Sequence, residues 1–159
     1  MVENTNIYPK NNSFFIGQTE AENLFLQAVQ TNTLHHAWLI SGPKGIGKAT
    51  LAYRIARFLL WANDADKGRY STLNVPENSE IFRGVSAGSN PDLMVVERDY
   101  IEADKKKIIS TIRKGETIAE SDYAAFKKSA FIRVDDIRKV NDFLAKTSFN
   151  NGWRVVIID

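Results

Sequence analysis

The chain of 159 residues contains no cysteine, which excludes disulfides and cysteine-ligated zinc. Its two histidines, His35 and His36, have no third ligand near them in the sequence and give little support for a metal site. A strong excess of one charge is also missing: 21 lysines and arginines oppose 19 acidic residues, and the net charge of +2 does not by itself indicate nucleic-acid binding. No apolar run approaches the roughly 18 residues of a membrane-spanning helix. We therefore expect a cytoplasmic protein of one globular domain, with no zinc and no membrane partner.

The most informative feature that is present is a glycine-rich loop between an apolar run and an amphipathic segment. Residues 37–41 have the pattern of a buried strand, and residues 42–48 follow with the phosphate-binding pattern G-x-x-x-x-G-K. Glycines allow positive φ and a close approach of the backbone to an anion, and the N-terminus of the next helix adds partial positive charge. Lys48 is placed to reach the β- and γ-phosphates of a nucleotide. The same loop without a ligand is the alternative interpretation.

One position departs from this pattern. A serine or threonine normally follows the lysine and supplies a hydroxyl to Mg²⁺, but this chain has Ala49. Thr50 carries a hydroxyl one position later, which lies about 100° further around a helix and makes it a poor substitute. The sequence therefore predicts a nucleotide-binding fold in which ATP with Mg²⁺ is a candidate cofactor and hydrolysis is weak or absent.

The N-terminal part of the chain surrounds this loop. We expect residues 1–13 to form a disordered leader and residues 14–159 to form the domain. Thr19 is predicted to cap the first helix, with Glu22 completing a capping box. After the loop, a helix with an apolar face is predicted to end near Ala62.

The middle of the chain is polar and harder to interpret. Residues 63–90 are predicted to be a polar insertion with a short helix over 76–86, starting at Pro76. Residues 108–112 could form an edge strand or a loop. The three lysines at 105–107 are interpreted as a solvated charge run rather than a nucleic-acid patch.

Two further apolar runs predict buried parallel strands, at residues 93–96 and 153–158. A helix is predicted to begin at Asp135 and to end at the Asn150-Asn151-Gly152 stop signal. Asp159 directly follows the last run and suits the carboxylate that holds Mg²⁺ in such proteins, a capping aspartate being the alternative. Because the chain stops there, we expect a fragment of a longer protein.

Several segments together resemble the clamp-loader subunits of the AAA+ family, and their order and spacing are most similar to the delta-prime subunits of bacterial DNA polymerase III. The segments are Ile16-Gly17-Gln18, residues 34–43, Asn90-Pro91-Asp92, residues 132–138 and residues 152–159. Many such subunits carry a four-cysteine zinc module, which this chain lacks. Relatives of the gamma/tau type keep the hydroxyl that Ala49 replaces, so the departure favours delta-prime.

The resemblance implies an α/β fold of the P-loop NTPase (AAA+) type, with a parallel sheet flanked by helices in the strand order 5-1-4-3-2. In that order a strand beyond Asp159 lies between the first and third strands, so we expect direct pairing of those two, a neighbouring chain in the gap, or a region outside this sequence. The implied roles are catalytic for Lys48 and Asp159, with Asp159 as the candidate magnesium ligand. The implied nucleotide-binding residues are Ile16, Gly17, Gly42, Pro43, Lys44, Gly45, Ile46, Gly47, Lys48, Ala49 and Thr50.

The implied function is that of a subunit in a DNA polymerase III holoenzyme, a nucleotidyltransferase complex. Its partners would be the delta and gamma/tau subunits and, through them, the sliding clamp and primed DNA. Whether the chain is itself an enzyme stays open. The alternative is an autonomous P-loop NTPase, either a gamma/tau-like clamp-loader ATPase or a DNA-repair motor.

Overall fold

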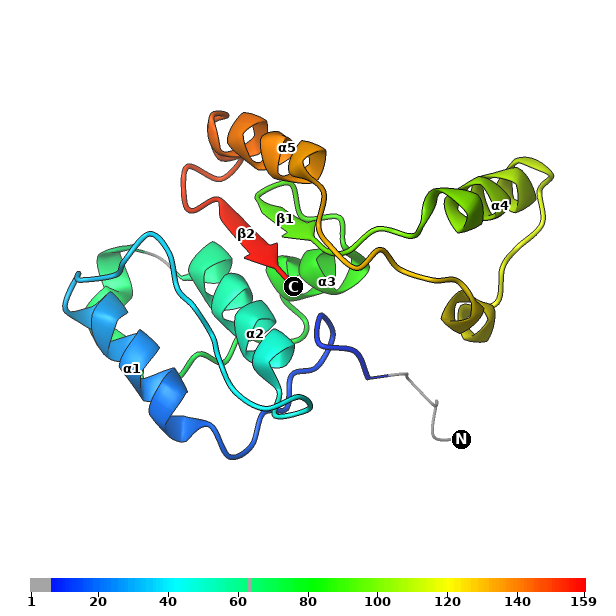
Figure 1. The fold of residues 1–159 in the computed structure, drawn as a ribbon. Coiled ribbons are helices and arrows are strands. Elements are labelled where there is room, and N and C mark those ends of the chain that lie inside the picture. Colours follow the sequence, from blue (N-terminus) through cyan, green and yellow to red (C-terminus); the bar gives the residue numbers. More distant parts are fainter. Residues whose placement is uncertain (1–6, 63) are drawn as a thin grey trace. The chain divides into compact units, whose positions relative to one another are not determined.

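The structure is a computed structural model that describes residues 7–62 and 64–159. The chain divides into two compact units, Met1–Met94 with Thr147–Ile157, and Val95–Lys146 with Ile158–Asp159. Figure 1 labels the main elements, which are α1 (Thr19–Gln30), α2 (Lys48–Trp61), α3 (Glu80–Ala87), β1 (Leu93–Val96), α4 (Glu102–Arg113), α5 (Val134–Leu144) and β2 (Val155–Ile158). Two short 3₁₀ helices, η1 (Asp64–Arg69) and η2 (Glu120–Ala125), complete the order.

The first unit is built on the packing of α1 against α2. Phe25, Leu26 and Val29 recur three and four positions apart, so they share one face of α1 and bury it. Phe58 of α2 and Leu73 close the same cluster, each nearly fully buried. Burial of each side chain of this size stabilises the folded state by roughly 1.5–3 kcal/mol, which makes this cluster the stabilising centre of the unit.

Residues 64–90 contribute to that core and contain α3, which starts later than the helix expected from the sequence. Tyr70 packs its ring edge against Phe58, with centroids 5.1 Å apart. α3 begins at Glu80 instead of Pro76, because the hydroxyl of Ser79 accepts a hydrogen bond from the N–H of Phe82 at 3.1 Å and caps the helix there.

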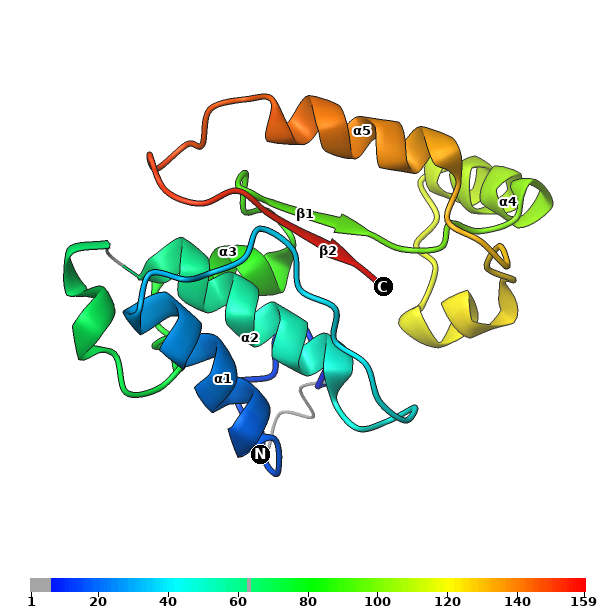
Figure 2. The ribbon, with the colours of Figure 1, turned by 60° about the vertical axis from the view of Figure 1, so that its left-hand side comes forward.

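The sheet contains two parallel strands, β1 and β2, which lie side by side in Figure 2. The N–H of Val155 donates to the carbonyl of Asp92 at 2.8 Å, and the N–H of Asp159 donates to that of Val96 at 3.0 Å. Both partners advance by the same number of residues, which is the register of a parallel ladder. The chain is therefore an α/β protein with a small parallel sheet flanked by helices, and both predicted strands over these runs are confirmed, the second in a shorter form.

The predicted strand over residues 37–41 is not formed. The segment pairs with neither β1 nor β2, and Leu39 within it is 93% exposed. A strand forms only where a neighbour takes its backbone hydrogen bonds, and neither strand of the sheet does so. Direct pairing of the first and third predicted strands is therefore wrong for the described residues.

The helix predicted over Asp135 to Asn150 is shorter in the structure, and a buried carboxylate holds the backbone between it and β2. α5 ends at Leu144, and further along Asp92 accepts the N–H of Phe149 on both carboxylate oxygens, at 2.9 and 3.0 Å. Asp92 is only 2% exposed. These bonds hold the backbone at Phe149 away from a helical path before β2 begins.

Two other local predictions were wrong. Residues 108–112 lie inside α4 rather than in a strand, because the helix places acidic Glu102 and Asp104 in its first turn and Arg113 in its last, which suits the helix dipole. Thr19 is the first residue of α1 and does not cap it. Glu22 accepts a hydrogen bond from Arg54 at 2.6 Å, and this ion pair takes the carboxylate that the capping box required.

The second unit holds its α4 segment with backbone pairing and an aromatic group. The N–H of Ile101 donates to the carbonyl of Lys127 at 2.9 Å, and Tyr100 forms an antiparallel bridge with Lys128. Tyr100, Tyr123 and Phe126 lie with ring centroids 6.1 to 6.2 Å apart. The pairing of these segments gives α4 a fixed attachment within its unit.

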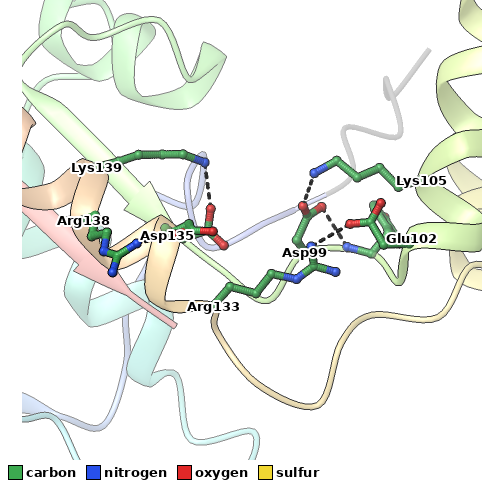
Figure 3. A network of polar contacts seen from close by, with 9 residues as sticks. Asp99, Glu102, Lys105, Arg133, Asp135, Arg138 and Lys139 are labelled. Carbon is green, nitrogen blue, oxygen red and sulfur yellow. Dashed lines mark hydrogen bonds and ion pairs between the residues drawn. The ribbon is translucent and has the colours of Figure 1, made fainter.

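Charge pairs add to the second unit, as Figure 3 shows. Lys105 pairs with Asp99, and Arg133 donates to Glu102 at 2.6 Å. Lys139 also donates to Asp136 at 2.8 Å. Lys105 thus belongs to an ion pair within the protein, which agrees with the interpretation of the lysine run as ordinary surface charge.

Candidate functional site

The glycine loop leads directly into α2. Gly45 and Gly47 have φ of +86° and +95°, in the left-handed region that only glycine adopts readily, and Gly47 is the residue that precedes α2. Lys48 is the first residue of the helix. Its ammonium turns back and donates to the carbonyls of Gly42 at 2.9 Å and Pro43 at 2.8 Å. The side chain therefore closes the loop into a ring.

This geometry can bind an anion. The first N–H groups of a helix have no partner within it, and they carry the positive end of the helix dipole. Here they lie at the same end of the helix as the ammonium of Lys48, which donates to two carbonyls, and a phosphate oxygen can compete with those carbonyls. The remaining loop residues, Pro43, Lys44 and Ile46, are exposed at the rim.

The residues after Lys48 do not fit a magnesium ion in the usual way. Ala49, half-buried in the first turn of α2, has no side-chain oxygen. Thr50 is also half-buried and lies one position further around the helix. The loop can thus contact phosphates, but the protein oxygen that normally coordinates the metal at this position is missing.

The segment that contains Ile16 and Gly17, two of the implied nucleotide-binding residues, follows Phe15, whose ring contacts the loop. A Cβ built on Gly47 would lie 2.9 Å from Cε2 of Phe15, so the ring lies directly against this glycine. Gly17 has a φ of +88°, and the neighbouring Ile16 is 78% exposed. The structure brings this segment to the loop, with the Ile16 side chain at the surface.

Asp159 is exposed and belongs to the second unit, whereas the loop belongs to the first. Its N–H completes the pairing of β2 with β1 at the carbonyl of Val96. Its role as a magnesium ligand stays a prediction. Among the side chains that the structure describes, no group of three or more histidines, aspartates or glutamates is placed to hold a metal ion.

Two buried arginines on α2 were not predicted from the sequence. Arg54 and Arg57 are 6% and 2% exposed, although arginine is seldom buried without partners. Spacing alone gave little signal, because Arg54 lies about 60° and Arg57 about 120° around the helix from Leu51, beside the apolar face and not within it. Burial, and secondarily the charge of Arg54, lowers the pKa of Arg57 to about 10, so it still carries its charge at neutral pH.

These features define a class of protein: an α/β chain with a parallel sheet and a glycine loop at a helix N-terminus, consistent with an AAA+ fold. The chain belongs to the DNA polymerase III delta subunit family, whose family model matches residues 17–159. It is thus a clamp-loader-type subunit of DNA polymerase III. Comparison with curated proteins and with solved structures gives no match.

The match begins at Gly17 and continues through β2, so it contains the loop, both strands and the helices. None of the helices in the described part of the chain is long and apolar enough to cross a membrane.

Proposed function

We propose that this chain acts as a delta-prime-type subunit of the clamp loader and takes part in placing the sliding clamp on primed DNA. In this role the glycine loop binds a nucleoside triphosphate weakly and does not hydrolyse it at a useful rate. Its partners are the delta and gamma/tau subunits, and its site of action is the cytoplasm.

The single observation that carries this proposal is the composition of the site at the start of α2. The loop and Lys48 provide donors for phosphate oxygens, and Ala49 provides none for the metal. Phosphate binding requires donors, which the loop and Lys48 provide. Phosphoryl transfer also requires a bound metal ion, for which Ala49 provides no oxygen.

The surface of α5 supports a role in an assembly. All of α5 is described, and none of its residues is buried. Val134 and Leu144 on its apolar face are 69% and 51% exposed. Exposed apolar side chains gathered on one helix are typical of protein contact surfaces.

The proposal is tested by titrating the chain with ATP, with Mg²⁺ and with EDTA. We expect weak binding that EDTA leaves almost unchanged. Lys48→Ala should weaken binding about tenfold, which corresponds to about 1.4 kcal/mol. Lys146→Ala removes an exposed lysine outside the loop and should change affinity little, which makes it the matched control. Ala49→Ser should raise affinity only when Mg²⁺ is present, because it restores the hydroxyl.

Phosphate release by the same variants separates the two functions considered for the sequence. Release at the background rate agrees with a subunit that binds without turnover. Several turnovers per second by the wild-type chain alone would contradict the proposal and favour an autonomous NTPase.

A further inference from the structure

The segment that leads to the loop, residues 8–17, is here called the N-terminal strap. It opens with a turn in which the N–H of Asn12 donates to the carbonyl of Tyr8 at 2.9 Å. Phe14 and Ile16 within it are 73% and 78% exposed. Burial of these two apolar side chains therefore does not hold the strap in place.

The strap is held by its backbone carbonyls, which accept hydrogen bonds from the two buried arginines of α2. Arg57 donates through one guanidinium nitrogen to the carbonyl of Lys10 at 2.8 Å and through the other to that of Asn12 at 2.7 Å. Arg54 donates to the carbonyl of Ser13 at 2.8 Å. Hydrogen bonds from a charged donor in a buried setting are among the stronger ones in proteins. This differs from the disordered leader expected over residues 1–13, of which residues 1–6 lie outside the described part of the chain.

Other contacts fix the arginines themselves. Arg54 also donates to Glu22 of α1 at 2.6 Å and to the side chain of Asn74 at 2.8 Å. The guanidinium of Arg57 lies 4.7 Å from the centre of the Phe82 ring on α3. Contacts on several sides thus fix the position of each guanidinium. The strap carbonyls that accept its hydrogen bonds are therefore fixed as well.

The strap ends at the glycine loop. Phe15 follows Ser13 by two residues, and its ring lies against Gly47, where it leaves no room for a Cβ. The guanidinium of Arg54 lies 5.7 Å from the centre of the same ring. Arg54 therefore both donates to the strap and lies beside the ring of Phe15, which contacts the loop.

We propose that Arg54 and Arg57 are positioning residues for the glycine loop: they hold the N-terminal strap so that Phe15 packs against Gly47 and limits the conformations of residues 42–48. A loop that is already restricted loses less conformational freedom when it closes around an anion. The effect on nucleotide affinity rests on the proposed function, whereas the effect on loop mobility does not.

Hydrogen exchange of the full chain without ligand tests the mobility directly. Arg57→Lys keeps the charge but loses the planar fork that spans two carbonyls. We expect it to speed exchange several-fold at residues 10–13 and at residues 42–48. Phe15→Leu keeps an apolar side chain and the hydrogen bonds from both arginines to the strap carbonyls, so exchange should rise at residues 42–48 alone.

Matched controls are available for both variants. Arg83→Lys changes an exposed arginine on α3, and Phe14→Leu changes the exposed phenylalanine next to Phe15. Neither should alter exchange in the loop. Slow exchange within β1 shows that a variant is still folded. If Arg57→Lys does not fold, Phe15→Leu alone tests whether the strap restricts the loop.

Titration with ATP then measures the functional consequence. Both Arg57→Lys and Phe15→Leu should raise the Kd about three- to tenfold, and the controls should leave it unchanged. Unchanged loop exchange in both variants would overturn the inference. If the wild-type chain binds no ATP, the proposed function fails, and the ligand-free exchange still decides whether the strap restricts the loop.

Discussion

At the scale of single residues, the loop contains two glycines with the same backbone requirement and different surroundings. Gly45 and Gly47 both have positive φ, but a Cβ on Gly45 would meet nothing within 4 Å. A Cβ on Gly47 would meet the ring of Phe15 at 2.9 Å. The two positions therefore separate the cost of the backbone conformation from the cost of the ring contact.

We predict that Gly45→Ala lowers the free energy of unfolding by about 1–2 kcal/mol, the cost of a left-handed backbone for a residue with a Cβ. Gly47→Ala should cost clearly more, because the ring of Phe15 must also move. Urea denaturation measures both values. In a Phe15→Leu background the excess cost of Gly47→Ala should shrink, and equal costs for the two glycines in the wild-type background would contradict the contact.

At the scale of elements, the start of a helix depends on which polar groups nearby are free to cap it. α3 is capped by the hydroxyl of Ser79, which accepts from the N–H of Phe82. At α1 the residue before the helix is Gln18, and its side chain makes no capping bond. The two helices should therefore respond differently to the loss of a hydroxyl near their N-termini.

We predict that Ser79→Ala lowers the free energy of unfolding by about 1 kcal/mol, the usual cost of losing such a cap. Thr19→Ala is the matched control and should change the free energy by only a few tenths, since Thr19 lies inside α1. Thermal or urea denaturation distinguishes them. A larger loss for Thr19→Ala would restore the capping box that the sequence suggested.

Elements with their own strong periodicity could be predicted from the sequence. α2 and β1 follow directly from apolar spacing, and the glycine loop follows from its pattern. The segment at residues 37–41 could not be predicted in the same way, because a strand depends on a neighbour that its own residues do not specify. α4 was missed because its isoleucines also suit a strand, and only its charged termini favour a helix.

Only part of the candidate site could be predicted, because the sequence specifies local patterns but not contacts between distant segments. Lys48 and the glycines of its loop are recognised by spacing alone, and the structure places them together. The positions of Arg54 and Arg57 could be noted beside an apolar helix face, but their partners are backbone carbonyls more than 40 residues away, at separations of 41 to 47. Backbone acceptors carry no residue-type signal, so such contacts appear only in the folded chain.

At the scale of the whole molecule, the buried apolar cluster lies in the first unit, and the carboxyls whose pKa is lowered lie in the second. In the first unit an apolar cluster and two buried arginines dominate the described contacts. In the second unit, carboxylates accept hydrogen bonds from cations and from the backbone. The N–H of Lys127 donates to Asp104 at 2.9 Å and, together with Lys107, lowers the pKa of that carboxyl. The hydrogen bond from Lys105 lowers the pKa of Asp99, and that from Arg133 lowers the pKa of Glu102.

All three pKa values are lowered, and this determines how the stability of the second unit changes at acid pH. A carboxyl whose pKa is lower in the folded state stabilises that state fully above its ordinary value, and the contribution is lost as the pH falls through the lowered value. The ordinary values are 3.8 for Asp99 and Asp104 and 4.5 for Glu102. The contacts around α4 should therefore be insensitive to pH between about pH 5 and 7 and should weaken below about pH 4.

The amide resonance of Lys127 reports this directly, because its N–H donates to Asp104. In an NMR titration we predict that this resonance shifts with a midpoint below 3.8, the ordinary value of an aspartate. Asp104→Asn should abolish the titration and reduce the pH dependence of α4 stability, since an amide has no proton to gain in this range. Glu116→Gln removes an exposed carboxylate and should leave the Lys127 titration unchanged. A midpoint at or above 3.8 would mean that the hydrogen bond does not favour the ionised carboxylate, and the acid response would then have to arise elsewhere in the unit.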